Sequence, residues 1–510
     1  MSVKNKKNNI QNIKIVFFLI LLAKIASFLS EIVIANSLGT SIDADVYSMV
    51  NGAYIVIYPM IGVGIWSGFL PKYKKLLAKN GKKQADTFAN KIINLFGVIS
   101  LIFALLFFFF SKQISGLVAP GFSIDAKDSL SIMLKIFAPY FVFDTISTIY
   151  ASMLQSHGKF FGSQIREVVC YLPTIFVGPY LYSVMGVYGF ALALIIGVVI
   201  RLLVLLPSIN WGYKYELVLN IKDSNVKSLT RNLPFLLISS GLEQIHSLVD
   251  KIMASNLLTG AVSGLNYGHK LINVFNGVIT TPITTVYYPQ MAEMVEKNEI
   301  GKLKKLVSKI LSLLIIITVP ITIMAALYSN DIVRLVFQRG QFDSNSTAIT
   351  STIFRCYSIG ILFSSIKLVT DKVLYSLEKV KIVAILSFIN VALNIILNVL
   401  FSKMIGAAGL ALATSISTII YVSISFIYLQ RYITFNVMKT IIRIFKIIII
   451  NTVSLILPYI ILSLISIDGV PRIIINITIG IIIEFVIFKT VDKNTMKEIT
   501  GLLKMIRMRK

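Results

Sequence analysis

The chain has 510 residues, of which 56% are hydrophobic and 14% are charged, and its formal net charge is +26. A mean hydropathy of +0.81 excludes an ordinary soluble protein, because no soluble domain of this size needs so much apolar sequence. The basic residues cluster between apolar segments, which excludes nucleic acid as a partner and is typical of loops beside anionic lipid.

Fourteen apolar segments are long enough to cross a membrane as helices. They occupy residues 13–35, 46–70, 88–110, 130–153, 164–184, 187–207, 232–256, 263–288, 306–328, 347–374, 380–401, 405–429, 443–466 and 471–489. The first segment follows several lysines but is too long for a signal peptide and lacks a small-residue cleavage site, so we expect a retained anchor. The sequence therefore predicts an all-α polytopic membrane protein with 14 transmembrane helices.

Connections rich in lysine and arginine alternate with connections that contain few or none of these residues. Residues 72–83, 208–231, 297–305, 431–446 and 493–510 are basic, whereas residues 36–45, 183–186 and 257–262 contain no lysine or arginine. Arg334 and Arg339 in the ninth connection are the exception. Because basic loops stay on the cytoplasmic side, an even number of spans with both termini in the cytoplasm explains the pattern.

The second half of the chain repeats parts of the first. Residues 186–193 (GVYGFALA) return 220 positions later as residues 406–413 (GAAGLALA), and Ser156 and Lys159 match Ser376 and Lys379 at the same offset. Residues 31–35 match 250–254 at an offset of 219. We therefore expect two six-helix lobes, made of segments 1–6 and 7–12, with two helices appended. Two such lobes around a central cavity are the architecture of a transporter.

These patterns predict six regions. They are a cytoplasmic tail at 1–12, an N-lobe at 13–207, a cytoplasmic linker at 208–231, a C-lobe at 232–429, two further helices within 430–489, and a basic cytoplasmic tail at 490–510.

Ionisable side chains inside the apolar segments are the candidate functional residues, because charge at that depth is costly and faces a protein interior or a wet cavity. Lys24 and Glu31 are seven residues apart and therefore share one face of the first helix. The candidate cations are Lys24, Lys270, Arg355 and Lys367, the candidate acids are Glu31, Asp45, Glu243, Asp250 and Asp371, and other polar candidates are His246, His269 and Asn273.

Charge recurs in segments 1, 7, 8 and 10, whereas segments 3, 6, 9, 11 and 12 are nearly free of it. We therefore expect the charged segments to line a common cavity that holds an anionic substrate and couples its movement to a cation or proton. For any single residue, a structural ion pair between helices is an equal alternative. Residues near segment ends, such as Arg166 and Lys251, are expected to extend to the membrane interface.

No motif predicts catalysis or a bound cofactor. The sequence has no phosphate-binding GxxxxGK[ST] loop, no HExxH and no GxSxG motif, so we expect a transporter that ATP does not drive directly. Cys170 and Cys356 each stand alone, and the three histidines are far apart in sequence, so neither a disulfide framework nor a metal site is predicted.

Short motifs along residues 24–428 carry a family resemblance. The most specific are residues 249–254 (VDKIMA) and 337–342 (FQRGQF); the others are Leu38-Gly39 with residues 45–47, residues 69–71, 137–140, 158–160 and 262–267, and Tyr288-Pro289. With these motifs the chain resembles the MurJ/MviN family of lipid II flippases, within the multidrug/oligosaccharidyl-lipid/polysaccharide flippase superfamily.

The resemblance implies fourteen helices in two lobes and alternating access across the bacterial cytoplasmic membrane. It also implies a cargo of sugars linked to undecaprenyl pyrophosphate and a groove for the lipid tail beside the last two helices. The family's cationic cavity positions fall on Lys24 and Lys270, and its acidic positions on Glu31 and Asp45.

Three positions depart from the family pattern. Ser30 replaces an expected arginine, Tyr58 stands near the position of another, and Asn273 stands where an acid is usual. The cavity thus keeps part of the family's charge, and this leaves the identity of the cargo open.

The leading hypothesis is a flippase for lipid II, with Lys24 and Lys270 binding pyrophosphate and Arg355 and Lys367 assisting. Glu31 and Asp250 would couple an ion, Na⁺ or a proton, or hold the cations in place; the membrane potential is the other driving force. Expected partners are the lipid-linked glycan, membrane lipids and the cell-wall synthesis machinery. Three alternatives stay open: a flippase for capsule or O-antigen-type repeat units, a multidrug/cation antiporter, and a scaffold whose transport site has degenerated.

Overall fold

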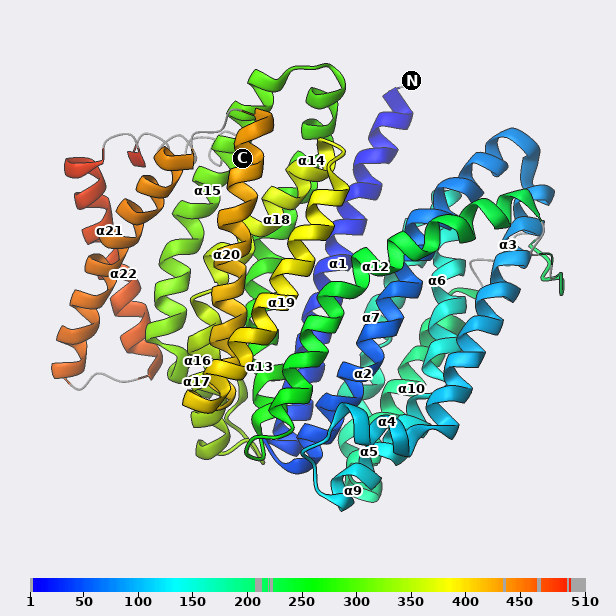
Figure 1. Ribbon diagram of the computed structural model, residues 1–510, viewed down its shortest axis with the longest axis horizontal. Coiled ribbons are helices and arrows are strands. Elements are labelled where there is room, and N and C mark those ends of the chain that lie inside the picture. Colours follow the sequence, from blue (N-terminus) through cyan, green and yellow to red (C-terminus); the bar gives the residue numbers. More distant parts are fainter. Residues whose placement is uncertain are drawn as a thin grey trace. The chain divides into compact units, whose positions relative to one another are not determined.

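A computed structural model describes residues 3–206, 213–218, 220, 223–433, 437–465, 469–492 and 495–496. Throughout these ranges the regular secondary structure is helical (Figure 1). The described residues form two compact units, one within 1–270 and 337–349 and the other within 271–336 and 350–510. This division differs from the predicted lobes, because α12 (Ser224–Ala254) and most of α13 (Ala261–Phe275) belong to the first unit.

The first unit begins with α1 (Val3–Leu38), which extends through the residues predicted as a tail. Its other helices before α12 are α2 (Ile42–Gly64), α3 (Leu70–Phe109), α4 (Ser111–Val118), α5 (Ile124–Phe137), α6 (Tyr140–Ser156), α7 (Phe160–Val169), α8 (Leu172–Phe176), α9 (Gly178–Met185) and α10 (Val187–Leu203). A π-helical turn, Ile65–Phe69, joins α2 to α3. The lysine-rich connection at 72–83 is therefore helical rather than a loop, interrupted only at Gly81.

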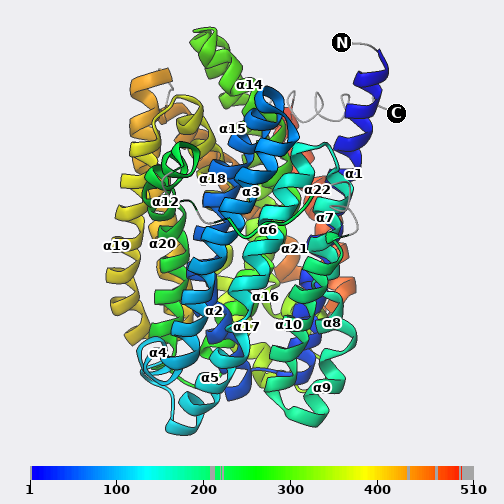
Figure 2. The same ribbon diagram turned by 90° about the vertical axis from the view of Figure 1, so that its right-hand side faces the viewer.

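Helices of the first unit pack in long pairs. Helix α3 runs along α6 (Figure 2), and Phe69, Phe88 and Ile149 are buried between them. Helix α1 lies against α7, and α2 lies against α12 and α5. Asp223 begins α12 because its carboxylate accepts the backbone N–H groups of Asn225 and Val226, at 2.8 and 3.3 Å.

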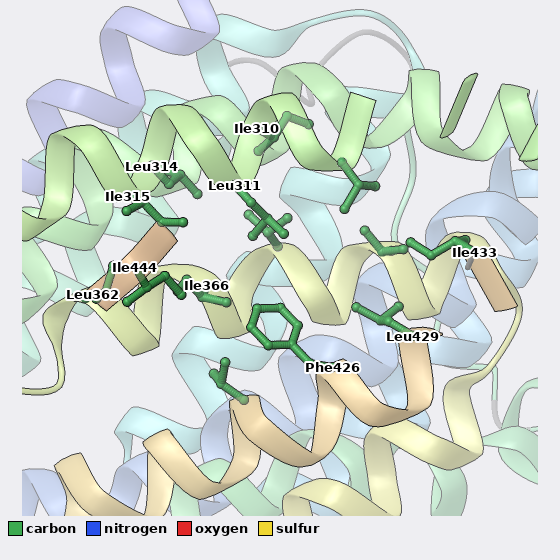
Figure 3. Packing of buried hydrophobic residues seen from close by; sticks show 14 of the residues in the cluster. Ile310, Leu311, Leu314, Ile315, Leu362, Ile366, Phe426, Leu429, Ile433 and Ile444 are labelled. Carbon is green, nitrogen blue, oxygen red and sulfur yellow. The ribbon is translucent and has the colours of Figure 1, made fainter. Parts of the chain in front are cut away.

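The second unit contains the remaining helices. After the π-helical turn Asn276–Thr280 they are α14 (Thr281–Glu296), α15 (Ile300–Leu327), α16 (Ser329–Phe337), α17 (Ser344–Ser358), α18 (Ile361–Ser376), α19 (Val380–Ile405), α20 (Ala407–Ile433), α21 (Val437–Leu464) and α22 (Gly469–Val491). Leu311 of α15, Ile366 of α18 and Phe426 of α20 meet in its apolar core (Figure 3).

Eight helices among the described residues are long and apolar enough to cross a membrane, or up to ten if each of two bent pairs counts as one span. The bent pairs are Phe160–Phe176 with Gly178–Met185, at 43°, and Ser344–Ser358 with Ile361–Ser376, at 47°. Each of the fourteen predicted segments falls on a helix or on consecutive helices. The chain is thus an all-helical polytopic membrane protein.

The repeated sequence folds alike at its turns. Gly186, between α9 and α10, has φ 61° and ψ −147°, and Gly406, between α19 and α20, has φ 59° and ψ −136°. A Cβ on Gly189 would lie 2.3 Å from the carbonyl carbon of Leu181. In the second copy, a Cβ on Gly409 would lie 2.1 Å from the carbonyl oxygen of Phe401, and both residues of this pair are 220 positions after their counterparts. Both copies therefore need glycine for the same tight helix–helix turn.

Candidate functional site

The polar face of α1 is the starting point of the site. Lys24, Ser27 and Glu31 follow one another at helical spacing on that face. The Lys24 side chain is exposed, whereas Glu31 is buried. Helix α1 packs against α7 and α8. The prediction that Lys24 and Glu31 share one face is therefore confirmed.

Glu31 is held by two residues of α13. Asn266 donates its side-chain amide to one carboxylate oxygen, and the Lys270 ammonium lies 3.2 Å from the other. Both oxygens thus have a partner, as a buried carboxylate requires. Lys270, predicted as a cavity cation, is an ion-pair partner of Glu31, and about a third of its side chain stays exposed.

Lys251 of α12 extends into the same network. It is buried, its ammonium donates to the carbonyl oxygen of Ser48 at 2.9 Å, and it lies 3.5 Å from the Asn266 side-chain oxygen. The expectation that Lys251 extends to the membrane interface is wrong, because the backbone of α2 and the nearby Glu31 stabilise the ammonium inside the protein. A Cβ on Gly52 would lie 2.7 Å from Lys251 Cδ, so this glycine makes room for the lysine.

Asp45, at the start of α2, caps the start of α13. Its carboxylate accepts the backbone N–H groups of Gly260 and Ser263 and the Ser263 hydroxyl, each at 2.7 Å. The first N–H groups of a helix lack partners within the helix and attract negative charge. Asp45 therefore joins α2 to α13 as a structural acid.

The segment at 337–343 packs on the turn between α1 and α2. Gln341 donates its backbone N–H to the carbonyl oxygen of Asn36 at 2.9 Å, and Thr40 donates to Ser346 at 3.0 Å. The backbone N–H of Ser346 donates to Asp343 at 2.7 Å and lowers the pKa of this carboxyl. Residues 337–342, one of the two most specific sequence motifs, thus anchor the end of α1.

A second charged cluster lies between α6, α7 and α10. Arg201 forms ion pairs with Asp144 and Glu167, and Arg166 lies 2.9 Å from Glu167. Arg166 is buried instead of extending to the interface, because Glu167 and the Ser147 hydroxyl, 2.9 Å away, accept its hydrogen bonds. Sequence reasoning missed Asp144 and Arg201. The same rule of charge within an apolar segment points to both.

The second unit holds two of the other predicted cations. The Lys367 ammonium lies 3.3 Å from Asp371 and 4.9 Å from the centre of the Tyr421 ring, and the Tyr421 hydroxyl donates to Asp371 at 2.6 Å. Arg355 is exposed and donates to the Ser329 hydroxyl at 3.0 Å. Lys367 thus forms an ion pair within α18, and Tyr421 of α20 contacts both of its members.

The remaining candidate residues lie on α12 and α13. Asp250 is buried on α12, His246 is half-buried, and His269 and Asn273 are exposed. The side chain of Glu243 lies outside the described residues. Among the described residues no group of three or more His, Cys, Asp or Glu side chains is placed to hold a metal ion.

The chain is similar to known proteins over most of its length. A family model described as "Lipid II flippase MurJ" matches residues 34–480. A "Probable lipid II flippase MurJ" of Rickettsia prowazekii is 23% identical over 411 residues, 79% of this chain and 80% of that protein. One of Rhizobium tropici is 24% identical over 408 residues, 78% of this chain and 76% of that protein.

Two solved structures have a similar fold. One is titled "Lipid II flippase MurJ, inward closed conformation"; it aligns with a TM-score of 0.79 and 24% identity over 94% of this chain and 98% of its own. The other is an inward-facing multidrug resistance transporter of the MATE family, with a TM-score of 0.68 and 11% identity over 85% of this chain and 98% of its own.

Proposed function

The chain belongs to the family of the lipid II flippase MurJ, and from this premise we propose that it moves lipid II from the inner to the outer leaflet of the bacterial cytoplasmic membrane. Members of this family are transporters and not enzymes. The observation that carries the proposal is the family match over residues 34–480. The alternatives of an antiporter, a flippase for other glycans and a scaffold are not favoured by that match.

The physical problem of this cargo is its pyrophosphate. Ionised phosphates cannot enter hydrocarbon without a large cost in free energy, so they need a polar, cationic path. The face of α1 supplies the first part of such a path, with an exposed ammonium at Lys24 and a partly exposed ammonium at Lys270. In this proposal both bind the pyrophosphate, with Arg355 and Lys367 assisting, while the lipid tail stays in the membrane.

The proposed architecture is fourteen spans, in two six-helix lobes with α21 and α22 added and both termini in the cytoplasm. Support comes from the alternation of basic connections and from the matching turns at Gly186 and Gly406. The six regions of the sequence analysis, with an N-lobe at 13–207 and a C-lobe at 232–429, stay part of this proposal.

Alternating access requires contacts that break and re-form. The bonds of Asp45 to α13 and of Lys251 to the backbone of α2 lie near the connections 36–45 and 257–262, which lack basic residues and are expected on the outer side. We assign these bonds to the closing of the outer entrance. Glu31 and Asp250 are then the candidate residues for coupling to Na⁺, to a proton or to the membrane potential.

The test is lipid II transport by purified protein in liposomes. Lys24→Ala with Lys270→Ala is expected to lower the flipping rate at least about tenfold, since truncating a charged contact typically costs ~2–5 kcal/mol. Lys24→Arg with Lys270→Arg keeps both charges and should retain transport. Lys297→Ala, which removes an exposed ion pair with Glu293, is the surface control. Normal lipid II transport by the double alanine variant would refute the assignment.

A further inference from the structure

Two cations of the first unit converge on one carboxylate, that of Glu167 on α7. Arg166 lies 2.9 Å from Glu167 Oε1, and Arg201 of α10 donates to the same oxygen. Helix α1, which carries Lys24, packs against α7. One carboxylate oxygen thus has two guanidinium partners.

The rest of this cluster is closed. Arg201 also binds Asp144, whose side chain is 0% exposed, and Arg166 also donates to the Ser147 hydroxyl. The Glu167 side chain, by contrast, is 33% exposed. Each arginine therefore has an inner partner that stays in place, and Glu167 is the outer, accessible partner.

Glu167 lies beside the same polar face of α1 that carries the transport site. Tyr171, one turn beyond Glu167, lies between α7 and α8, and both of these helices pack against α1. Lys24 and Glu31 are seven residues apart, about 10 Å along the helix axis. This face thus carries the Glu31–Lys270 ion pair and the exposed Lys24, and it packs against the helix that carries Glu167.

We propose that Glu167 is an internal counter-ion, which neutralises the outer faces of Arg166 and Arg201 until an anionic diphosphate takes its place. This rests on the proposed function only in identifying the diphosphate with that of the lipid-linked cargo. A diphosphate fits the position because guanidinium groups bind phosphate oxygens through paired hydrogen bonds, and because it carries more charge than one carboxylate. The displaced carboxylate can turn toward its exposed side.

Glu167, which competes with the diphosphate for the arginines, affects both loading and release of the cargo. A carrier must bind its cargo strongly enough to load it and weakly enough to release it. Glu167 lowers the affinity for diphosphate by occupying the cations in the empty state, and it drives release by returning to them. Removing its charge should therefore tighten binding and slow the transport cycle.

The test is binding of inorganic pyrophosphate to the purified full-length protein, measured by titration calorimetry. Glu167→Gln keeps the shape but removes the charge, and should bind pyrophosphate about fivefold more tightly, the effect of a partly exposed ion pair worth ~1 kcal/mol. Glu293→Gln, at an exposed position on α14, should bind like the wild type. Equal or weaker binding by Glu167→Gln would overturn the proposal.

Glu167→Asp serves if the glutamine variant does not fold, because it keeps the charge while withdrawing it from the arginines by one methylene. It should bind pyrophosphate more tightly than the wild type but less tightly than Glu167→Gln; binding no tighter than the wild type would also overturn the proposal. Flipping of lipid II in liposomes separates the two ideas. If Glu167→Gln binds pyrophosphate more tightly but the wild type does not transport lipid II, the counter-ion role stands and the proposed function is refuted. If the wild type transports lipid II but Glu167→Gln binds pyrophosphate no more tightly, only the counter-ion role is refuted.

Discussion

Asp45→Asn is the substitution that most directly tests the junction between α2 and α13. The wild-type carboxylate accepts three hydrogen bonds, from the backbone N–H groups of Gly260 and Ser263 and from the Ser263 hydroxyl, all at 2.7 Å. Asparagine has no charge and one acceptor oxygen. Its amide group would point donors at the donors of α13, so one bond is lost and the others become bonds to a neutral acceptor.

The size of the effect follows from these bonds. A hydrogen bond to a charged group contributes ~1.5–3 kcal/mol and a neutral one ~1 kcal/mol, so losing one and weakening two costs about 3 kcal/mol. At about 1.4 kcal/mol for each factor of ten, local opening of the start of α13 should become about a hundredfold more frequent.

Hydrogen exchange of the amides in residues 257–264, followed by mass spectrometry, measures this opening directly. Asp43→Asn is the matched control, because Asp43 lies in the same first turn of α2 and is only partly buried. If Asp45→Asn speeds exchange by less than about fivefold, or no more than Asp43→Asn does, the capping role derived from these bonds is refuted.

Two glycine substitutions test close approaches. In Gly52→Ala the new Cβ would lie 2.7 Å from Lys251 Cδ, so the lysine must leave its bond to α2 and the thermal unfolding midpoint should fall, by the equivalent of ~1–3 kcal/mol. In Gly340→Ala the residue keeps φ 57°, which costs ~1–2 kcal/mol for a residue with a side chain, and the Cβ would lie 2.4 Å from the carbonyl oxygen of Asn36. The unfolding midpoint of Gly340→Ala should therefore fall further than this conformational cost alone would lower it.

Matched glycines separate steric from conformational effects in these two experiments. Gly97 on α3 has open space around it, so Gly97→Ala should be neutral or stabilise by ~0.5–1 kcal/mol. Gly158 has φ 75° but no neighbour within 4 Å, so Gly158→Ala reports the conformational cost alone. Equal midpoints for Gly340→Ala and Gly158→Ala would contradict the clash with Asn36, and an unchanged midpoint for Gly52→Ala would contradict the tight fit of Lys251.

Sequence reasoning succeeded where it used local periodicity. The shared face of Lys24 and Glu31 follows from helical spacing, and the repeat at an offset of 220 correctly marks Gly186 and Gly406 as equivalent turns. It failed where it judged residues by their position along a segment. Lys251 was expected at the interface because it lies near the end of a segment, yet it is buried.

The sixth segment is nearly free of charge, yet its one arginine decides how the segment packs. Arg201 lies in that segment and is buried against Asp144 and Glu167. One arginine in seventeen residues of α10 changes the average hydropathy little. In a membrane, however, a single charge requires a partner, so a count of charges per segment misses what one residue imposes on its neighbours.

The sequence by itself determined the class of the protein, the positions of its helices, the residues that share a helix face, and the repeat. These properties depend on apolar length and on the spacing of nearby residues, which can be read along the chain. Only the tertiary structure decided which charges meet: Lys270 with Glu31, Lys251 with the backbone of α2, and Arg201 with Asp144 and Glu167. Ion pairing depends on distances of a few ångströms between distant parts of the chain, and only the packing of the helices sets those distances.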